Sequence, residues 1–174
     1  IVSNKYSDDF KVLGPNTKFK KAFNAIKNTI DQLPLIFYPT RTKTYFSINW
    51  LYSNNLINYI NNLNPDIVHL HWINGGMLRI EDIKKIKSPI IWSLHDNWAF
   101  TGGCHIMWEC DKYKLECGKC PILDSKKEND LSKKIFKRKI KSYDNINDIT
   151  IVNLSRWINN YSKDSILLKN KKHI

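Results

Sequence analysis

The protein has 174 residues, of which 42% are hydrophobic and 12% aromatic, and its 28 Lys and Arg against 16 Asp and Glu give a net charge of +12. This length suits one ordinary domain, and the apolar content is sufficient for a core, which excludes wholesale disorder. The longest stretch without a charged residue, residues 44–65, contains seven Asn and is therefore not a membrane span. No secretory signal is visible, so we expect a cytoplasmic protein.

The first third of the chain is predicted to contain one short strand and two helices. Residues 1–3 resemble the end of a strand, as in a fragment of a longer chain. Apolar residues recur every three or four positions over residues 15–30 and again over residues 50–63, which is typical of amphipathic helices. The second helix is expected to end before Asn64-Pro65, because a residue that precedes proline disfavours the helical conformation.

Three apolar runs, at residues 66–71, 89–94 and 149–154, each predict a buried strand. Helical patterns near residues 77–86 and 131–143 separate them, and Ser155 is a candidate N-cap for a final helix. This alternation predicts an α/β fold, a Rossmann-like parallel sheet with helices on both faces. Residues from about 101 to 122 are expected to leave the sheet as a Cys-rich loop excursion.

Polar residues follow each predicted strand, at the edge where an open parallel sheet binds its ligands. They are His71, Asn74, Gly75 and Gly76 after the first strand, His95 and Asp96 after the second, and Ser155 and Arg156 after the third. The glycine pair allows a close approach of the backbone to a ligand, and the Asp96 carboxylate is placed to orient the His95 imidazole. A tight turn, a structural histidine and a helix cap are the plain alternatives for these three clusters.

Four cysteines lie within 17 residues, at Cys104, Cys110, Cys117 and Cys120. A secreted disulfide scaffold of this size spreads its cysteines over the chain, whereas four clustered thiolates suit a closed, tetrahedral structural zinc site. His95 or His105 is a possible substitute for one thiolate. Free thiols and disulfides are the alternatives to zinc.

The segment 126–141 contains eight Lys or Arg and only two acidic residues. Such charge is typical of a solvated helix face, of a surface that binds anionic lipid and of one that binds nucleic-acid phosphates. As a helix it turns Leu131, Ile135 and Ile140 inward and Lys133, Lys134, Lys137 and Lys141 outward. Together with the cysteines it permits a zinc-ribbon nucleic-acid-binding module, an alternative that leaves the strand-end residues unexplained.

Two stretches, Pro65-Asp-Ile-Val-His-Leu-His-Trp-Ile-Asn-Gly-Gly76 and Trp92-Ser-Leu-His-Asp-Asn-Trp-Ala-Phe-Thr-Gly-Gly-Cys-His105, resemble bacterial family 4 glycosyltransferases of the GT-B fold. Cys117-Gly-Lys-Cys-Pro121 and Ile151-Val-Asn-Leu-Ser-Arg-Trp157 belong to the same pattern. The subgroup found in capsule, O-antigen and exopolysaccharide gene clusters is the most similar. The resemblance runs from about residue 60 to the end of the chain.

This resemblance implies that residues 1–174 are an incomplete N-terminal, acceptor-side half of a GT-B enzyme, without the nucleotide-sugar domain and inactive alone. The full-length enzyme would transfer a hexosyl group from a nucleotide sugar to a glycan or lipid-linked acceptor in bacterial surface polysaccharide synthesis. The family pattern implies retention of configuration, no catalytic metal and no nucleic-acid partner. A non-catalytic scaffold with a degenerate cleft is a further interpretation.

By the family pattern, His95 matches a histidine that faces the cleft and contacts the transferring sugar or the acceptor, and it is the expected catalytic residue. Asn74, Gly75 and Gly76 match the loop that shapes the acceptor pocket. Ser155 and Arg156 match the end of the strand before the crossover to the second domain. Independently of the resemblance, the outward lysines of the helix near residues 131–143 are expected to hold the full-length enzyme on an anionic membrane surface, at the inner face of the cell membrane.

Overall fold

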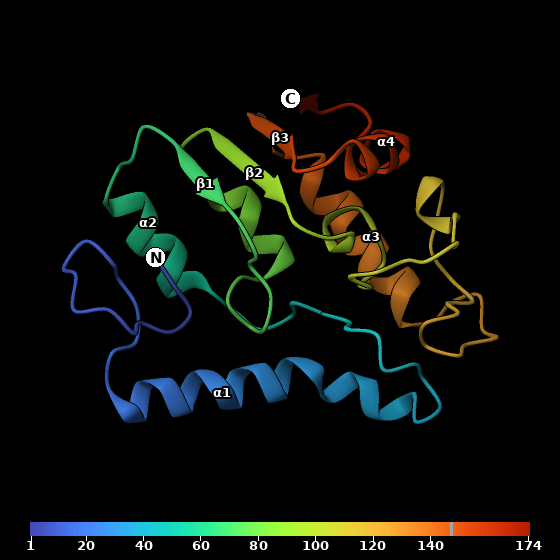
Figure 1. The fold of residues 1–174 in the computed structure, drawn as a ribbon, viewed down its shortest axis with the longest axis horizontal. Coiled ribbons are helices and arrows are strands. Elements are labelled where there is room, and N and C mark those ends of the chain that lie inside the picture. Colours follow the sequence, from blue (N-terminus) through green and yellow to red (C-terminus); the bar gives the residue numbers. More distant parts are fainter. Residues whose placement is uncertain (147) are drawn as a thin grey trace.

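The computed structural model describes residues 1–146 and 148–174, and a four-stranded parallel sheet in the order β1-β2-β3-β4 forms its centre (Figure 1). The strands are Val68–Leu70 (β1), Ile90–Leu94 (β2), Ile149–Asn153 (β3) and Lys172–His173 (β4). The three strands predicted at 66–71, 89–94 and 149–154 are therefore confirmed, as is the α/β class. Parallel pairing places the carboxyl ends of β1 and β2 side by side, with Leu70 opposite Trp92.

The predicted strand at residues 1–3 is wrong. The segment is irregular and largely exposed, and the Val2 amide donates to the Leu13 carbonyl while the Lys5 amide donates to the Pro15 carbonyl. Two apolar residues are too few to specify a register, so the segment pairs with a nearby loop instead of with the sheet.

The helices lie close to their predicted positions. They are α1 (Lys18–Gln32), η1 (Leu33–Phe37), α2 (Asn54–Asn62), η2 (Ile80–Lys85), η3 (Trp98–Phe100), η4 (Lys112–Lys114), α3 (Leu131–Tyr143) and α4 (Arg156–Asp164), where η marks a 3-10 helix. Side-chain caps start three of them: Thr17 accepts from the Lys20 amide, Asp130 from the Lys133 amide and Ser155 from the Ile158 amide. The predicted role of Ser155 as an N-cap is thus confirmed.

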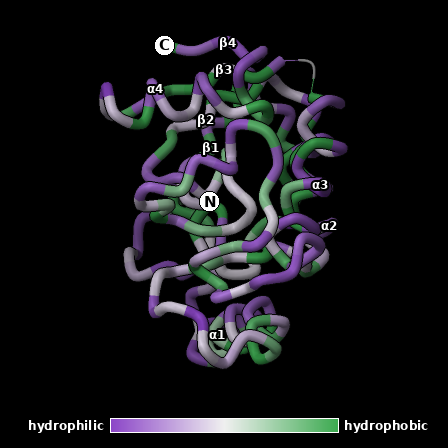
Figure 2. Tube along the Cα trace, turned by 90° about the vertical axis from the view of Figure 1, so that its right-hand side faces the viewer, coloured by the Kyte–Doolittle hydropathy of each residue, from purple (hydrophilic) through white to green (hydrophobic). Residues whose placement is uncertain are grey.

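The core lies between the sheet and the helices η2 and α3, which pack behind the strands (Figure 1). The Tyr143 ring of α3 meets the Trp92 ring of β2 edge-on at 5.7 Å between centroids. Figure 2 shows hydrophobic segments gathered in this region, with α1 as a separate layer at one end of the molecule. We predicted helices on both faces of the sheet. In the part of the chain that the structure describes, the sheet face that points away from η2 and α3 is half-exposed at Ile91, Thr150 and Val152.

Helix α3 buries its predicted apolar side. Ile135 is buried, Leu131 and Ile140 are half-buried against the core, and Lys134, Lys137 and Lys141 are exposed. Lys133 departs from the prediction, because it is half-buried and pairs with Glu116 at 3.0 Å.

Lys139, on the same helix, is fully buried and donates to the carbonyls of Trp98 and Thr101. Burial lowers the pKa of Lys139 to about 7. The basic segment is thus partly structural, since Lys139 holds the loop that follows β2 onto α3.

The predicted Cys-rich excursion is confirmed, because residues 101–122 contain one isolated antiparallel bridge, Phe46 to Cys104, and a 3-10 turn. A Cβ added at Gly102 would lie 2.5 Å from the Ser132 carbonyl oxygen, and one at Gly103 would lie 2.6 Å from the Phe46 ring. These glycines are therefore required by close packing of the excursion. Among the described residues, no helix is long and apolar enough to cross a membrane.

Candidate functional site

Three histidine side chains form a row at the carboxyl ends of β1 and β2. The His71 and His95 rings are joined by a hydrogen bond of 3.0 Å between Nδ1 of His71 and Nε2 of His95. The His69 ring lies 4.3 Å from the His71 ring, and its Nε2 is 2.8 Å from the Ser93 hydroxyl. Partial desolvation first, and then the neighbouring His69 and His95, lower the pKa of His71 below its usual value. The structure thus brings His71 and His95 together, both exposed to solvent.

The Asp96 side chain does not orient His95, so this expectation is wrong. Its Oδ2 instead lies 2.7 Å from Nδ1 of His105, and its Oδ1 accepts from the Trp98 amide at 2.8 Å. The chain turns after β2, so adjacent side chains point in different directions. The partner of His95 comes from β1, across the sheet.

Nε2 of His105 lies 2.8 Å from the Ser47 hydroxyl, which completes a Ser-His-Asp relay. The same order of groups activates the nucleophile of many hydrolases. Here, however, Ser47 is only 2% exposed, so its hydroxyl has no access to a substrate. The relay therefore ties the loop after β2 to the segment that precedes Asn49.

The loop Asn74-Gly75-Gly76 follows β1 and has the backbone geometry that glycine permits. Gly75 and Gly76 have φ angles of 66° and 75°, in the left-handed region. Asn74 is 4% exposed, and its Oδ1 has no hydrogen-bond partner within the described residues. The loop thus combines a left-handed backbone with a buried amide side chain just after β1.

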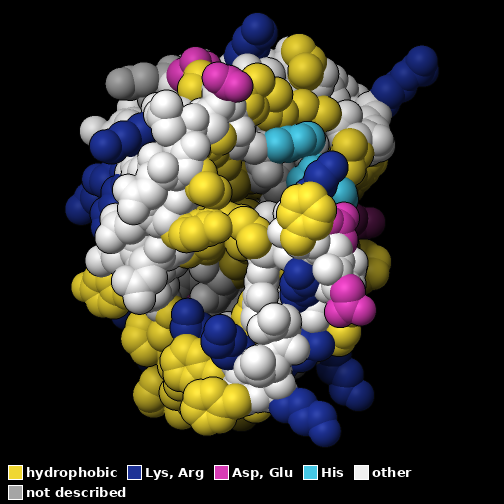
Figure 3. All heavy atoms as spheres, turned by 90° about the vertical axis from the view of Figure 1, so that its left-hand side faces the viewer, with side chains coloured by type: hydrophobic (Ala, Val, Ile, Leu, Met, Phe, Trp, Pro, Cys, Tyr) yellow, Lys and Arg dark blue, Asp and Glu magenta, His cyan; other side chains and the backbone are white. Residues whose placement is uncertain are grey.

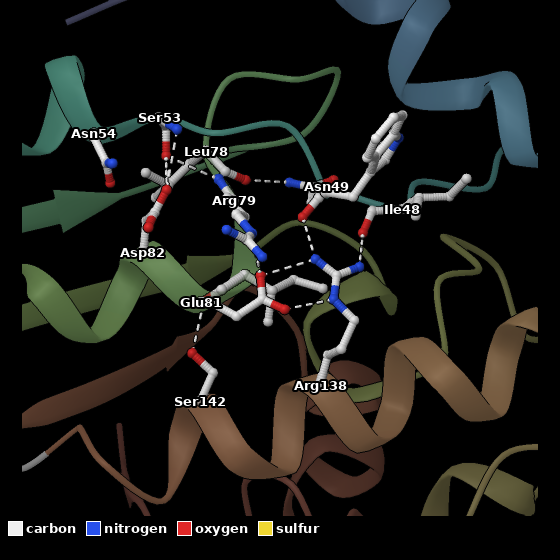
Figure 4. Close-up of polar contacts among 12 residues, drawn as sticks. Ile48, Asn49, Ser53, Asn54, Leu78, Arg79, Glu81, Asp82, Arg138 and Ser142 are labelled. Atoms are coloured by element: carbon white, nitrogen blue, oxygen red, sulfur yellow. Dashed lines mark hydrogen bonds and ion pairs between the residues drawn. The ribbon is translucent and has the colours of Figure 1, made fainter.

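Asn49 clamps both ends of this loop. Its Nδ2 donates to the Ile73 carbonyl at 3.1 Å. It also donates to the Leu78 carbonyl at 2.8 Å (Figure 4). Its own amide donates to Oδ2 of Asp31 on α1 at 3.1 Å. Burial raises the pKa of Asp31 above its usual value, against the backbone N–H groups that favour the carboxylate. The candidate loop is thereby tied to α1 through a fully buried side chain.

Arg138 of α3 holds the same segment from the other side (Figure 4). Its guanidinium binds the Glu81 carboxylate through two contacts of 2.6 and 2.9 Å, and it donates to the Ile48 and Asn49 carbonyls. Burial of Glu81 opposes its ionisation, but the hydrogen bond and charge of Arg138 outweigh this and lower the pKa of Glu81. The scaffold of the site is thus fixed by charge-assisted bonds.

A cavity of about 650 Å³ opens between this loop, the inner side of α1 and the N-terminal segment. Amide side chains dominate its polar lining: Asn4, Asn24, Asn28, Asn54, Asn55 and Asn74. Trp72 and Tyr52 add aromatic rings, and Gly75 and Gly76 form part of the wall. Figure 3 shows the imidazoles gathered on one face of the molecule, with hydrophobic side chains and a hollow beside them.

His95 borders a second, smaller hollow together with His71, Asp96 and Asn74. Asn74 and Trp72 line both spaces and form the wall between them. Ser155 and Arg156 lie after β3, exposed, and border neither space. The structure therefore brings together the residues that follow β1 and β2, and it places those that follow β3 apart.

None of the four cysteines forms a disulfide, and all four line one small cavity beneath the excursion. Burial raises the pKa of Cys104 to about 12, and it also raises the pKa of Cys117. Over residues 1–146 and 148–174, however, no group of three or more His, Cys, Asp or Glu side chains is arranged to hold a metal ion. Zinc stays a prediction.

Several residues of the site escaped the sequence analysis. These are His69, Ser47, Asn49, Asp31 and Arg138. Only His69 carried a sequence signal, since it shares a strand face with His71 two residues later.

The sequence profile of the family described as Glycosyl transferase 4-like matches residues 17–118, which include α1, the histidine row and the Asn74 loop. Over 70 residues the chain is 30% identical to the putative colanic acid biosynthesis glycosyl transferase WcaC of Escherichia coli (strain K12). That match covers 35% of this chain and 17% of the relative. No solved structure matches the chain. Since the profile spans more than half of its residues, the chain belongs to the glycosyl transferase 4-like family.

Proposed function

We propose that the protein is the acceptor-side domain of a glycosyltransferase of bacterial surface polysaccharide synthesis. The full-length enzyme transfers a hexosyl group from a nucleotide sugar, bound by a further domain, to a glycan or lipid-linked acceptor, with retention of configuration. Family membership supports the reaction class, and the similarity to a protein named for colanic acid biosynthesis supports the polysaccharide product.

The observation that carries the proposal is the amide-lined cavity beside the histidine pair. Each Asn side chain offers both donors and acceptors, which suits sugar hydroxyls that act as both. The aromatic rings of Trp72 and Tyr52 are 45% and 70% exposed and offer flat apolar surfaces to a sugar ring. Asn74 lies in the wall of this cavity, where its side-chain amide offers a further polar group to the acceptor.

His95 provides the polar contact to the reacting groups. Only one hydrogen fits between Nδ1 of His71 and Nε2 of His95, so one ring donates and the other accepts according to their tautomers. Nδ1 of His95 is then free to bind a hydroxyl of the transferring sugar or, when protonated, a phosphate oxygen of the donor. His71 acts as a positioning residue that holds the His95 ring in one orientation.

Zinc belongs to this proposal only as a structural ion of the cysteine cluster. Four soft sulfur donors around one cavity suit zinc. Zinc binding would have to bring these sulfur atoms closer to one another than they lie in the present structure. The ion would pin the excursion that follows His95 and takes no part in transfer.

The test is a transfer assay with the full-length enzyme, a nucleotide-sugar panel and membrane or glycan acceptors. We expect His95→Ala to lower kcat by about 10²-fold, the loss typical of a positioned polar group that acts on developing charge. His173→Ala, on the remote strand β4, is the matched control. Wild-type turnover by His95→Ala would refute the role of His95, and the absence of any transfer by the wild type would favour a scaffold.

A further inference from the structure

Helix α1 has the opposite orientation to an ordinary amphipathic surface helix, which presents its apolar side to the core. Its polar side faces the protein: Lys21, Asn24, Lys27, Asn28 and Gln32 are half-buried and Asp31 is fully buried. Its apolar side faces solvent. Phe19 is 82% exposed, Phe23 53% and Ile26 55%, and the stripe continues through Leu33 to Ile36 and Phe37.

This orientation is enforced by specific contacts of the polar side. Asp31 accepts from the Asn49 and Trp50 amides, and the Trp50 indole donates to the Asp31 carbonyl, all at 3.1 Å. A Cβ added at Gly76 would lie 3.1 Å from the Lys27 carbonyl oxygen, so the helix backbone packs directly on the Asn74 loop. The apolar stripe is therefore held outward and cannot rotate into the core.

Positive charge borders the stripe without any exposed acid. Over residues 18–43 the basic residues are Lys18, Lys20, Lys21, Lys27, Arg41 and Lys43, and the one acid, Asp31, is buried. The Lys27 ammonium lies 5.6 Å from the Phe23 ring centroid, at the edge of the stripe. Figure 3 shows hydrophobic side chains gathered at the α1 end of the molecule with Lys and Arg around them.

We propose that α1 and η1 form a membrane-docking surface that lies flat in the headgroup region of an anionic phospholipid bilayer. Phenylalanines on one side and lysines at the border are the composition of an interfacial helix. A second copy of the chain fits less well, because two such helices would bring lysines together without acids to pair with them. Helix α3, in contrast, offers charge alone, since its apolar side is buried.

Docking through α1 would place the amide-lined cavity at the membrane, because Asn24, Lys27 and Asn28 line the cavity from the inner side of the same helix. This consequence rests on the proposed function, since a lipid-linked acceptor would then enter from the bilayer. Membrane binding itself does not rest on the proposed function, and it is measured without any transfer reaction.

The test is flotation of the purified protein with phosphatidylcholine vesicles and with vesicles that also contain phosphatidylglycerol. We expect binding to the anionic vesicles, and at least about tenfold weaker partitioning of Phe19→Ser/Phe23→Ser. Leu63→Ser/Leu115→Ser removes exposed apolar side chains elsewhere and is the control. Lys18→Glu/Lys20→Glu should weaken binding about tenfold or more, and more than Lys134→Glu/Lys141→Glu, which makes the same change of charge on α3.

Circular dichroism checks that each variant is folded. The proposal is overturned if the wild type does not float with anionic vesicles, or if the α1 and α3 variants lose binding equally. It is also overturned if sedimentation shows a dimer that Phe19→Ser/Phe23→Ser converts to monomers, because a second copy then covers the stripe.

Discussion

Replacing Asn49 with Ala should remove the clamp that closes the Asn74 loop. The substitution deletes hydrogen bonds to the Ile73 and Leu78 carbonyls, which lie at the two ends of the loop. Each lost bond costs about 1 kcal/mol, and more where a buried carbonyl is left without a partner. Asn49 also has a φ of 49°, a left-handed conformation that costs Ala about 1 kcal/mol more than Asn. We therefore expect the free energy of unfolding to fall by about 3–5 kcal/mol.

Urea denaturation followed by tryptophan fluorescence measures this change. Asn64→Ala is the matched control, since Asn64 has a φ of 45° but is exposed, and it should cost only the backbone part, about 1 kcal/mol. Asn49→Gly removes the backbone cost and keeps the loss of both bonds. If Asn49→Ala destabilises the protein no more than Asn64→Ala does, the clamp contributes nothing and the reasoning fails.

Three further predictions concern charge, backbone and metal. Arg138 lowers the pKa of Glu81 in the folded protein, so ionised Glu81 stabilises the fold at pH values above 4.5, the usual pKa of a glutamate, and this stabilisation is lost as the pH falls through the lower pKa of the folded state. The melting temperature of Glu81→Gln should therefore depend less on pH below about 5 than that of the wild type. An unchanged pH profile would contradict the pairing of Glu81 with Arg138. Gly76→Ala should cost about 1–2 kcal/mol, because its Cβ would lie 3.1 Å from the Lys27 carbonyl oxygen at a φ of 75°. Gly75→Ala should cost less, since its nearest neighbour is the end of the Asn28 side chain, and an equal cost for both would refute the packing argument. Elemental analysis of protein purified without added metal should find about one zinc per chain, reduced in Cys117→Ser, whereas four titratable thiols and no metal would leave the cluster as free cysteines.

Strands β1, β2 and β3 were predictable because each is a short apolar run bounded by polar or proline-containing turns, whereas β4 is two polar residues, Lys172 and His173, and has no such pattern. The partner of His95 was not, because contacts across strands depend on register, and adjacency in sequence suggested Asp96 instead. Hydrophobic periodicity predicted α1 as a helix, but it does not say which side faces the core. That choice depends on Asp31, whose carboxylate binds the Asn49 and Trp50 amides.

Asn49 itself had no signal in the sequence, since it is one of seven Asn in residues 44–65. Its role arises from a left-handed backbone and from two carbonyls that the fold brings within reach. Arg138 was likewise hidden in a run of lysines. What distinguishes it from them is its contact with Glu81 on η2, which the sequence does not show.

Amide NMR spectra recorded during titration with oligosaccharide acceptors would show whether sugars bind at the Asn74 loop. We predict that the resonances of Asn74, Gly75 and Gly76 shift together, and that Asn74→Ala weakens binding while the exposed Asn58→Ala does not. Oligosaccharides that leave this loop unchanged, together with an RNA that shifts residues 126–141, would refute acceptor binding at this site and favour a nucleic-acid-binding protein.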